Sequence, residues 1–111
     1  MSKSTELTNQ IINFIYRQGG YAWRAESSGV FDQKLGGYRT APKKGVADVL
    51  GLYKGKFLAI EIKIGKDRLS PEQEGFLKNV EYVGGLSFVA RDLESFEEWW
   101  TNHIPDVTKM V

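Results

Sequence analysis

The pattern of apolar and polar positions divides the chain into helical and extended segments. The first helix is predicted by apolar residues at helical spacing, which are Leu7, Ile11, Ile12, Phe14 and Ile15. Ser4 or Thr5 is expected to cap this helix, and Gly19-Gly20 is expected to end it. The stretch YAWRAE, residues 21–26, then has the composition of a short strand.

The middle of the chain combines a segment without periodicity and a predicted hairpin. Residues 27–45 are rich in glycine and basic side chains, and a loop of this length in a compact domain is usually functional or mobile. Strands are predicted over residues 46–53 and 56–64, with Lys54-Gly55 as a two-residue hairpin turn.

Capping residues predict where a second helix begins. Ser70 is placed as the N-cap, Pro71 at the first helical position and Gln73 as the partner in a capping box, and Gly84-Gly85 is expected to stop the helix.

A strand over residues 86–90 and a last helix, capped by Asp92 or Ser95, complete the order α-β-β-β-α-β-α. Because a helix joins the third and fourth strands, a right-handed crossover to a parallel strand is expected. The sequence therefore predicts one α/β domain over residues 1–111, with a mixed central sheet flanked by helices.

The composition of the chain excludes several classes of protein. The chain has no cysteine, and its single histidine, His103, cannot form a multi-histidine zinc site within one chain. It has no apolar run of the roughly 20 residues that a membrane span needs. The N-terminal residues lack the pattern of a signal peptide, so a cytoplasmic location is expected.

Charge is distributed unevenly along a chain whose formal net charge is only +1. Residues 34–68 hold nine basic and three acidic side chains, whereas residues 69–111 hold three basic and eight acidic ones. A positive surface formed by the middle segment would attract polyanions, and nucleic acid is one candidate. The simpler alternative is a solvated basic face balanced by the acidic third of the chain.

Charged residues interrupt the strand predicted over 56–64. Side chains alternate along a strand, so Leu58, Ile60, Ile62 and Ile64 share one face, and Phe57, Ala59, Glu61 and Lys63 share the other. With a two-residue turn at Lys54-Gly55, Asp48 pairs with Glu61, which places two carboxylates across from each other, about 5 Å apart at their β-carbons.

Two facing carboxylates repel each other unless a cation lies between them. Oxygen ligands without cysteine favour a hard ion, Mg²⁺ or Mn²⁺. Lys63 adds an ammonium beside that position, and the three groups together are suited to metal-assisted phosphodiester hydrolysis. The alternative is an Asp48–Lys63–Glu61 ion network with a purely structural role. Gln73 is fully explained as a capping residue and could also face the site.

At these residues the chain resembles the virus-type replication-repair nuclease (VRR-NUC) family of the PD-(D/E)xK nuclease superfamily, which is related to Holliday-junction resolvases. The resemblance runs from about Glu6 to Ala90. It rests on GVADVLGL with Asp48, AIEIK with Glu61 and Lys63, SPEQ with Gln73, and on GGLSFVAR and YAWRAESSG. Ala47 stands where the superfamily has proline.

The resemblance implies a restriction-endonuclease-like α-β-β-β-α-β core and divalent-metal-dependent cleavage of DNA, with Holliday-junction or other branched DNA as the expected substrate, in a DNA-repair or phage context. It implies Asp48, Glu61, Lys63 and Gln73 as catalytic residues. The implied metal ligands are Asp48, Glu61, the Ile62 backbone carbonyl and Glu6. Glu6 has an equally good explanation as an acid near a helix N-terminus.

Candidates for DNA contacts are polar and basic residues, most of them in the long middle loop: Ser27, Ser28, Arg39, Lys43, Lys44 and Lys66. Phosphate contacts carry little sequence information, so recognition of DNA shape is expected. The resemblance also implies a homodimer. Two sites related by a two-fold axis would suit a four-way junction or duplex, whereas a monomer with one site would nick DNA or cut flaps.

Apolar residues of the last third could supply the dimer interface or simply fill the core: Val83, Phe88, Phe96, Trp99, Trp100 and Ile104. Neighbouring helix positions point about 100° apart, so Trp99 and Trp100 are expected to be hard to bury together. Two other functions stay open. One is a non-catalytic nucleic-acid-binding module or a partner-dependent nuclease subunit, and the other is an interaction protein such as an inhibitor-like dimer.

Overall fold

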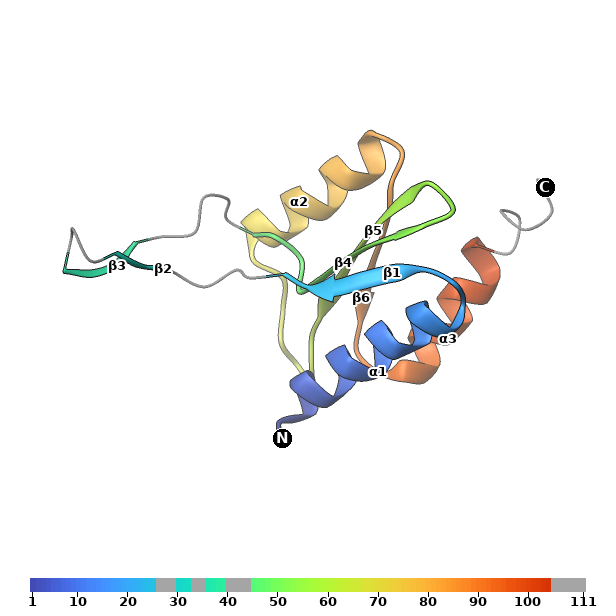
Figure 1. Cartoon of the computed structure of the whole chain (residues 1–111), viewed down its shortest axis with the longest axis horizontal. Coiled ribbons are helices and arrows are strands. Elements are labelled where there is room, and N and C mark those ends of the chain that lie inside the picture. The colour runs from blue at the N-terminus through green and yellow to red at the C-terminus, as the bar shows by residue number, and fades with distance from the viewer. Residues whose placement is uncertain (26–29, 33–35, 40–44, 105–111) are drawn as a thin grey trace.

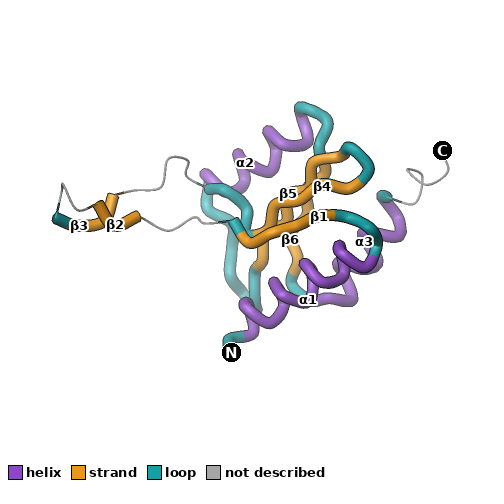
Figure 2. Tube along the Cα trace, in the orientation of Figure 1, coloured by secondary structure: helices purple, strands orange, loops and turns teal. Residues whose placement is uncertain are grey.

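The computed structural model describes residues 1–25, 30–32, 36–39 and 45–104. The elements, drawn in Figures 1 and 2, are α1 (Lys3–Arg17), β1 (Tyr21–Arg24), β2 (Val30–Asp32), β3 (Gly37–Arg39), β4 (Val49–Tyr53), β5 (Lys56–Ile62), α2 (Pro71–Tyr82), β6 (Leu86–Ala90) and α3 (Leu93–His103).

A four-stranded mixed sheet forms the centre, with the strand order β1-β4-β5-β6. β1 and β5 both run antiparallel to β4, and β6 runs parallel to β5, as the crossover through α2 requires. The predicted mixed α/β architecture is therefore confirmed. β2 and β3 form a separate two-stranded sheet that lies away from the central one in Figure 1. The segment between β1 and β4 thus contains two short strands that its composition did not indicate.

The β4–β5 hairpin has the predicted register. Tyr53 pairs with Lys56, and both turn residues have positive φ, 47° at Lys54 and 84° at Gly55. Positive φ at both positions is the type I′ geometry, whose twist matches that of the flanking strands. The turn therefore determines which residues of β4 face which residues of β5.

Helix caps differ from the predictions at one point. The N-cap of α1 is Ser2, whose hydroxyl accepts a hydrogen bond from the Thr5 amide (3.2 Å), so the expected cap at Ser4 or Thr5 is wrong by a few residues. Ser2 satisfies the free amide of the first turn, and the helix can therefore start earlier. α3 is capped by Asp92, one of the two expected residues.

Two apolar clusters cover the two faces of the sheet. α1 and α3 pack on one face, where Leu58, Ile60 and Ile62 join the larger cluster, and α2 lies on the other (Figure 1). Under α2, Ala59 packs with Leu77 and other residues of a smaller cluster. The face of β5 that carries Glu61 is thus partly apolar, and the polar residues occupy its end.

Both tryptophans of α3 are buried, so the expectation that they would be hard to bury together is wrong. Trp100 packs edge-on against Phe14 of α1 and against Tyr53 of β4, with ring centroids 5.5 and 4.9 Å apart. Trp99 stacks on Phe88 of β6 at 5.0 Å. α3 contacts α1 on one side and β6 on the other, and these neighbours cover both directions.

The same packing removes most of the expected interface residues from the surface. Phe96, Trp99, Trp100 and Ile104 are all buried in the larger cluster and Phe88 is half-buried against it, whereas Val83 is 80% exposed. Core filling therefore explains these aromatic residues.

Over the described ranges, no helix combines the length and apolar character that a membrane crossing requires.

Replacing Phe96 by alanine tests this core. Phe96 is fully buried and its ring contacts Phe14, Phe88, Trp99 and Trp100, so we expect Phe96→Ala to lower the free energy of unfolding by about 3–5 kcal/mol. Val83→Ala, at an exposed position, is the control and should change it by less than about 0.5 kcal/mol. Urea denaturation measures both values, and a loss below about 1 kcal/mol for Phe96→Ala would contradict the assignment of the core.

Candidate metal and catalytic site

Asp48 lies directly before β4 and is held by both neighbouring strands. Its side-chain Oδ2 accepts a hydrogen bond from the Ile62 amide at 2.8 Å, and its carbonyl oxygen accepts one from the Ala25 amide at 2.9 Å. The last backbone pair of the β4–β5 ladder is Val49–Ile60, so the Asp48 carboxylate continues the ladder beyond its end. These contacts leave Asp48 little freedom to turn away from β5.

Glu61 is a buried carboxyl group near the end of an interior strand of the sheet. It lies in β5, pairs with Val89 of β6, and is only 1% exposed. Its Oε2 atom is buried and has no hydrogen-bond partner among the residues that the structure describes. A buried acceptor without a partner costs free energy, so a group of this kind is suited to a ligand that supplies positive charge or a proton.

The surroundings of Glu61 raise its pKa from the ordinary 4.5 to about 9. Burial is the largest cause, because it disfavours the charged form. Hydrogen bonding to the Asp48 carboxyl and the negative charge of Asp48 add to the increase, and the Lys63 ammonium opposes it. Glu61 therefore retains its proton at neutral pH when no cation is bound.

Lys63 follows the end of β5 by one residue. Its amide donates to the Ala90 carbonyl oxygen at 3.0 Å, which extends the β5–β6 pairing and keeps this segment in line with the strand. Its side chain is half-buried, and its charge acts on Glu61. The structure thus brings Asp48, Glu61 and Lys63 together at one end of the central strands.

Gln73 forms the capping box at the start of α2. Its side-chain Oε1 atom accepts a hydrogen bond from the Ser70 backbone amide at 2.9 Å. The Gln73 backbone amide donates one to the Ser70 hydroxyl at 3.1 Å. The predicted cap is therefore confirmed, and the side-chain oxygen is used in it. The side-chain amide nitrogen is the part of Gln73 that can serve a site.

Glu6 stands apart from the carboxyl pair. It is exposed in the first turn of α1. Within the described ranges, no group of three or more His, Cys, Asp or Glu side chains is close enough to hold a metal ion. The acidic cluster in this part of the chain is consequently the Asp48–Glu61 pair alone, and a role for Glu6 stays a prediction.

Most of the expected DNA contacts fall in the long middle loop. Ser27, Ser28, Lys43 and Lys44 lie outside the described residues, and Arg39 is described only by its backbone, at the end of β3. Lys66 is exposed in the loop between β5 and α2.

Arg91 is a residue that the sequence pattern did not indicate. Its guanidinium donates to the carbonyl oxygens of Gly65 (3.0 Å) and Asp67 (2.9 Å), so it holds the loop that carries Lys66. The sequence around a single arginine after a strand does not indicate this role, because the hydrogen-bond partners are backbone atoms 26 and 24 residues away.

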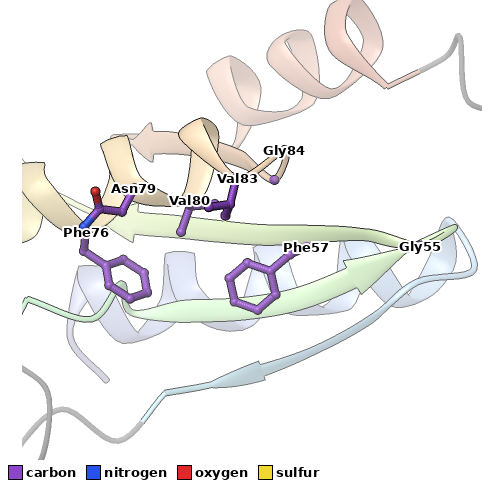
Figure 3. Close-up of a pocket in the computed structure, with 8 residues that line it drawn as sticks. Gly55, Phe57, Phe76, Asn79, Val80, Val83 and Gly84 are labelled. Carbon is purple, nitrogen blue, oxygen red and sulfur yellow. The ribbon is translucent and has the colours of Figure 1, made fainter.

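An apolar pocket lies away from these polar residues. Its volume is about 460 Å³, and Figure 3 shows Phe57 and Phe76 on its wall, with Val80, Val83 and glycines of the β4–β5 and α2–β6 turns. Phe57 is near the start of β5, whereas Glu61 is near its end. The pocket is therefore a feature of the α2 side of the sheet and not part of the carboxyl site.

A structural comparison identifies the class of fold. The chain is similar to Hjc of Archaeoglobus fulgidus, described as a Holliday junction resolvase from an archaeal hyperthermophile, with a TM-score of 0.55 and 22% sequence identity over 80% of this chain and 68% of that one. No protein-family model matches the sequence, and no curated protein matches it. At this level of identity the comparison shows a shared fold, the mixed α/β fold of that resolvase with a C-terminal helix.

The raised pKa of Glu61 makes stability depend on pH. Between pH 4.5 and about pH 9 the folded chain binds a proton that the unfolded chain has lost, so the metal-free protein should lose stability as the pH rises through this range. Glu61→Gln removes the titration and should stabilise the protein by about 1–3 kcal/mol at pH 8 in EDTA.

Urea denaturation at several pH values between 5 and about 9 measures this effect, with Glu98→Gln on the exposed side of α3 as the control. A wild-type profile that is no steeper than that of Glu61→Gln would show that Glu61 is ionised in the folded protein.

Proposed function

We propose that this chain is a divalent-metal-dependent endonuclease that hydrolyses phosphodiester bonds in branched DNA, with Holliday junctions as the first candidate substrate. The observation that carries the proposal is the Asp48–Glu61 carboxyl pair. It has a buried oxygen without a hydrogen-bond partner among the described residues, and an ammonium beside it. The similarity of the fold to a resolvase supports it.

The donor set fits a hard cation. Asp48 and Glu61 provide carboxylate oxygens, and the Ile62 backbone carbonyl is a further ligand in the proposal. Oxygen ligands of this kind suit Mg²⁺ or Mn²⁺. The chemistry that a divalent ion would supply at these residues is polarisation of a phosphate and a lower pKa of a coordinated water.

The chain's own residues have distinct roles in the proposed reaction. On binding of a divalent ion, Glu61 would give the proton that it holds at neutral pH to solvent, so that both carboxylates could act as ligands. Lys63 orients the attacking water and offsets negative charge that develops on the phosphate. The Gln73 amide nitrogen orients the water or Lys63. Glu6 is retained only as a ligand acting through water.

DNA contacts are proposed for the basic and polar residues outside the site. Ser27, Ser28, Arg39, Lys43, Lys44 and Lys66 would bind backbone phosphates, which favours recognition of shape over sequence. Arg91 supports this by holding the loop that presents Lys66. We further propose that the chain acts as one VRR-NUC-like domain in the cytoplasm of a bacterial or phage-infected cell.

Cleavage assays test the proposed activity. Wild-type protein should cut labelled four-way junction, flap or linear duplex DNA in Mg²⁺ or Mn²⁺, and we expect the junction to be cut fastest. Asp48→Asn keeps an acceptor for the Ile62 amide but loses a charged ligand, and it should reduce cleavage by about 10²-fold or more while DNA binding persists.

Asp67→Asn, in the exposed loop, is the matched control and should leave the rate within about twofold. Binding of DNA without cleavage in either metal would exclude a self-sufficient nuclease and would leave the alternative, a non-catalytic binding module or a partner-dependent nuclease subunit.

A homodimer is proposed as the working form, through the face of the sheet that α2 leaves open. Tyr21 of β1 and Leu52 of β4 are paired across the two strands and are 57% and 45% exposed, and Trp23 is 38% exposed. Trp23 pairs with Leu50, which packs under α2, so these side chains share the α2 side of the sheet with the pocket around Phe57. Exposed apolar side chains of this kind suit a two-fold contact, because they bring no like charges together across the axis.

Sedimentation equilibrium tests this form of the protein. We expect wild type to dimerise and Leu52→Lys to weaken the association at least tenfold, since two buried ammonium groups would meet across the axis. Glu98→Lys, on the opposite side of the sheet, should leave the association unchanged. A wild-type chain that stays monomeric at all concentrations would rule the dimer out.

A further inference from the structure

Gly45 makes a close backbone contact between the lead-in to β4 and the first turn of α2. It lies three residues before Asp48 and has a φ of +78°. A β-carbon at this position would overlap the carbonyl group of Glu72 and lie 2.8 Å from the Gln73 nitrogen. Figure 1 shows this part of the chain passing beside the start of α2.

Neither side of this contact can easily move. The obstructing atoms belong to helix backbone, and the turn that contains them is held by the two hydrogen bonds of the Ser70–Gln73 capping box and by Pro71 at its start. A side chain at position 45 would also be strained by the positive φ, which only glycine adopts freely. The fit therefore requires glycine for two independent reasons.

The contact has a short connection to the carboxyl pair. Between Gly45 and Asp48, Ala47 is fully buried and belongs to the same apolar cluster as Leu77 of α2. The segment thus contacts α2 at two points. Immediately afterwards, Asp48 is hydrogen-bonded to Ala25, directly after β1, and to Ile62 of β5. Its position relative to the start of α2 depends on these contacts.

We propose that Gly45 is a positioning residue of the metal site: its backbone contact with the first turn of α2 holds Asp48 and Gln73 at their working separation. The inference rests on the proposed nuclease function and concerns the assembly of that same site. It predicts that changes at Gly45 impair metal binding and turnover more than they impair the overall stability of the chain.

Two substitutions separate the reasons for glycine. Gly45→Ala introduces both the strain and the overlap, whereas Gly45→Asn keeps the overlap in a residue that tolerates positive φ better. We expect both to weaken Mn²⁺ binding, measured by calorimetry, at least tenfold. At saturating Mn²⁺ we expect kcat for DNA cleavage to fall by about 10²-fold, with KM for DNA unchanged.

Two other glycines provide matched controls. Gly85→Ala would bring its β-carbon to 2.7 Å from Val80 Cγ1 at the far end of α2, so it should lower the melting temperature without altering Mn²⁺ affinity. Gly75→Ala lies within α2 with nothing near its β-carbon and should be neutral or stabilising.

The outcomes distinguish the inference from the proposed function. If wild type fails to bind Mn²⁺, the proposed metal site is wrong and the inference falls with it. If wild type binds Mn²⁺ and Gly45→Ala binds it equally well, only the inference is wrong. The inference is also overturned if Gly85→Ala loses as much Mn²⁺ affinity as Gly45→Ala, because that would indicate general destabilisation. It is likewise overturned if Gly45→Asn behaves as wild type, because strain alone would then explain the need for glycine.

Wild-type protein supplies a test that does not depend on the folding of a variant. Binding of Mg²⁺ should slow hydrogen exchange of the Gln73 and Glu74 amides at the start of α2, and leave exchange at the Val83 end of α2 unaltered. Uniform or absent protection along α2 would contradict the coupling through Gly45.

Discussion

The enclosure of the Glu61 carboxyl group between strands is the constraint on which the rest of this structure depends. A buried acid that faces a second acid is unfavourable unless a proton or a cation compensates it. Here the folded chain places Glu61 at 1% exposure beside Asp48, and the raised pKa expresses the resulting cost. Apolar packing elsewhere must offset that cost, and the larger cluster under α1 and α3 is the part of the molecule that can do so.

The two sides of the sheet differ in how completely helices cover them. On one side, the aromatic residues of α3 pack with α1 and β6 into a closed core. On the other, α2 covers only part of the sheet, and its two ends border different features. The first turn of α2 contains Gln73 and meets the segment that leads into Asp48, whereas the apolar pocket around Phe57 lies toward its last turn. A rigid core on one side allows the other side to hold costly polar groups and exposed apolar residues.

Several elements could be predicted because their signals are local. The type I′ turn at Lys54-Gly55 sets the register of β4 and β5, and counting back from that turn is enough to bring Asp48 opposite Glu61. The capping box at Ser70 and Gln73 is equally local. The error at Trp99 and Trp100 had a different origin, because the burial of adjacent helix positions depends on what packs on each side of the helix, and periodicity contains no information about those neighbours.

The sequence by itself determined the order of the elements of the central sheet, the turn that aligns two of them, and the residue types able to bind a hard cation. Each follows from interactions between residues that are near in sequence or paired by a single turn. Only the tertiary structure decided how deeply Glu61 is buried, that Arg91 holds the loop of Lys66, and that Gly45 meets the first turn of α2. These contacts join backbone and side chains more than 20 residues apart, so their strength depends on the packing of the whole chain.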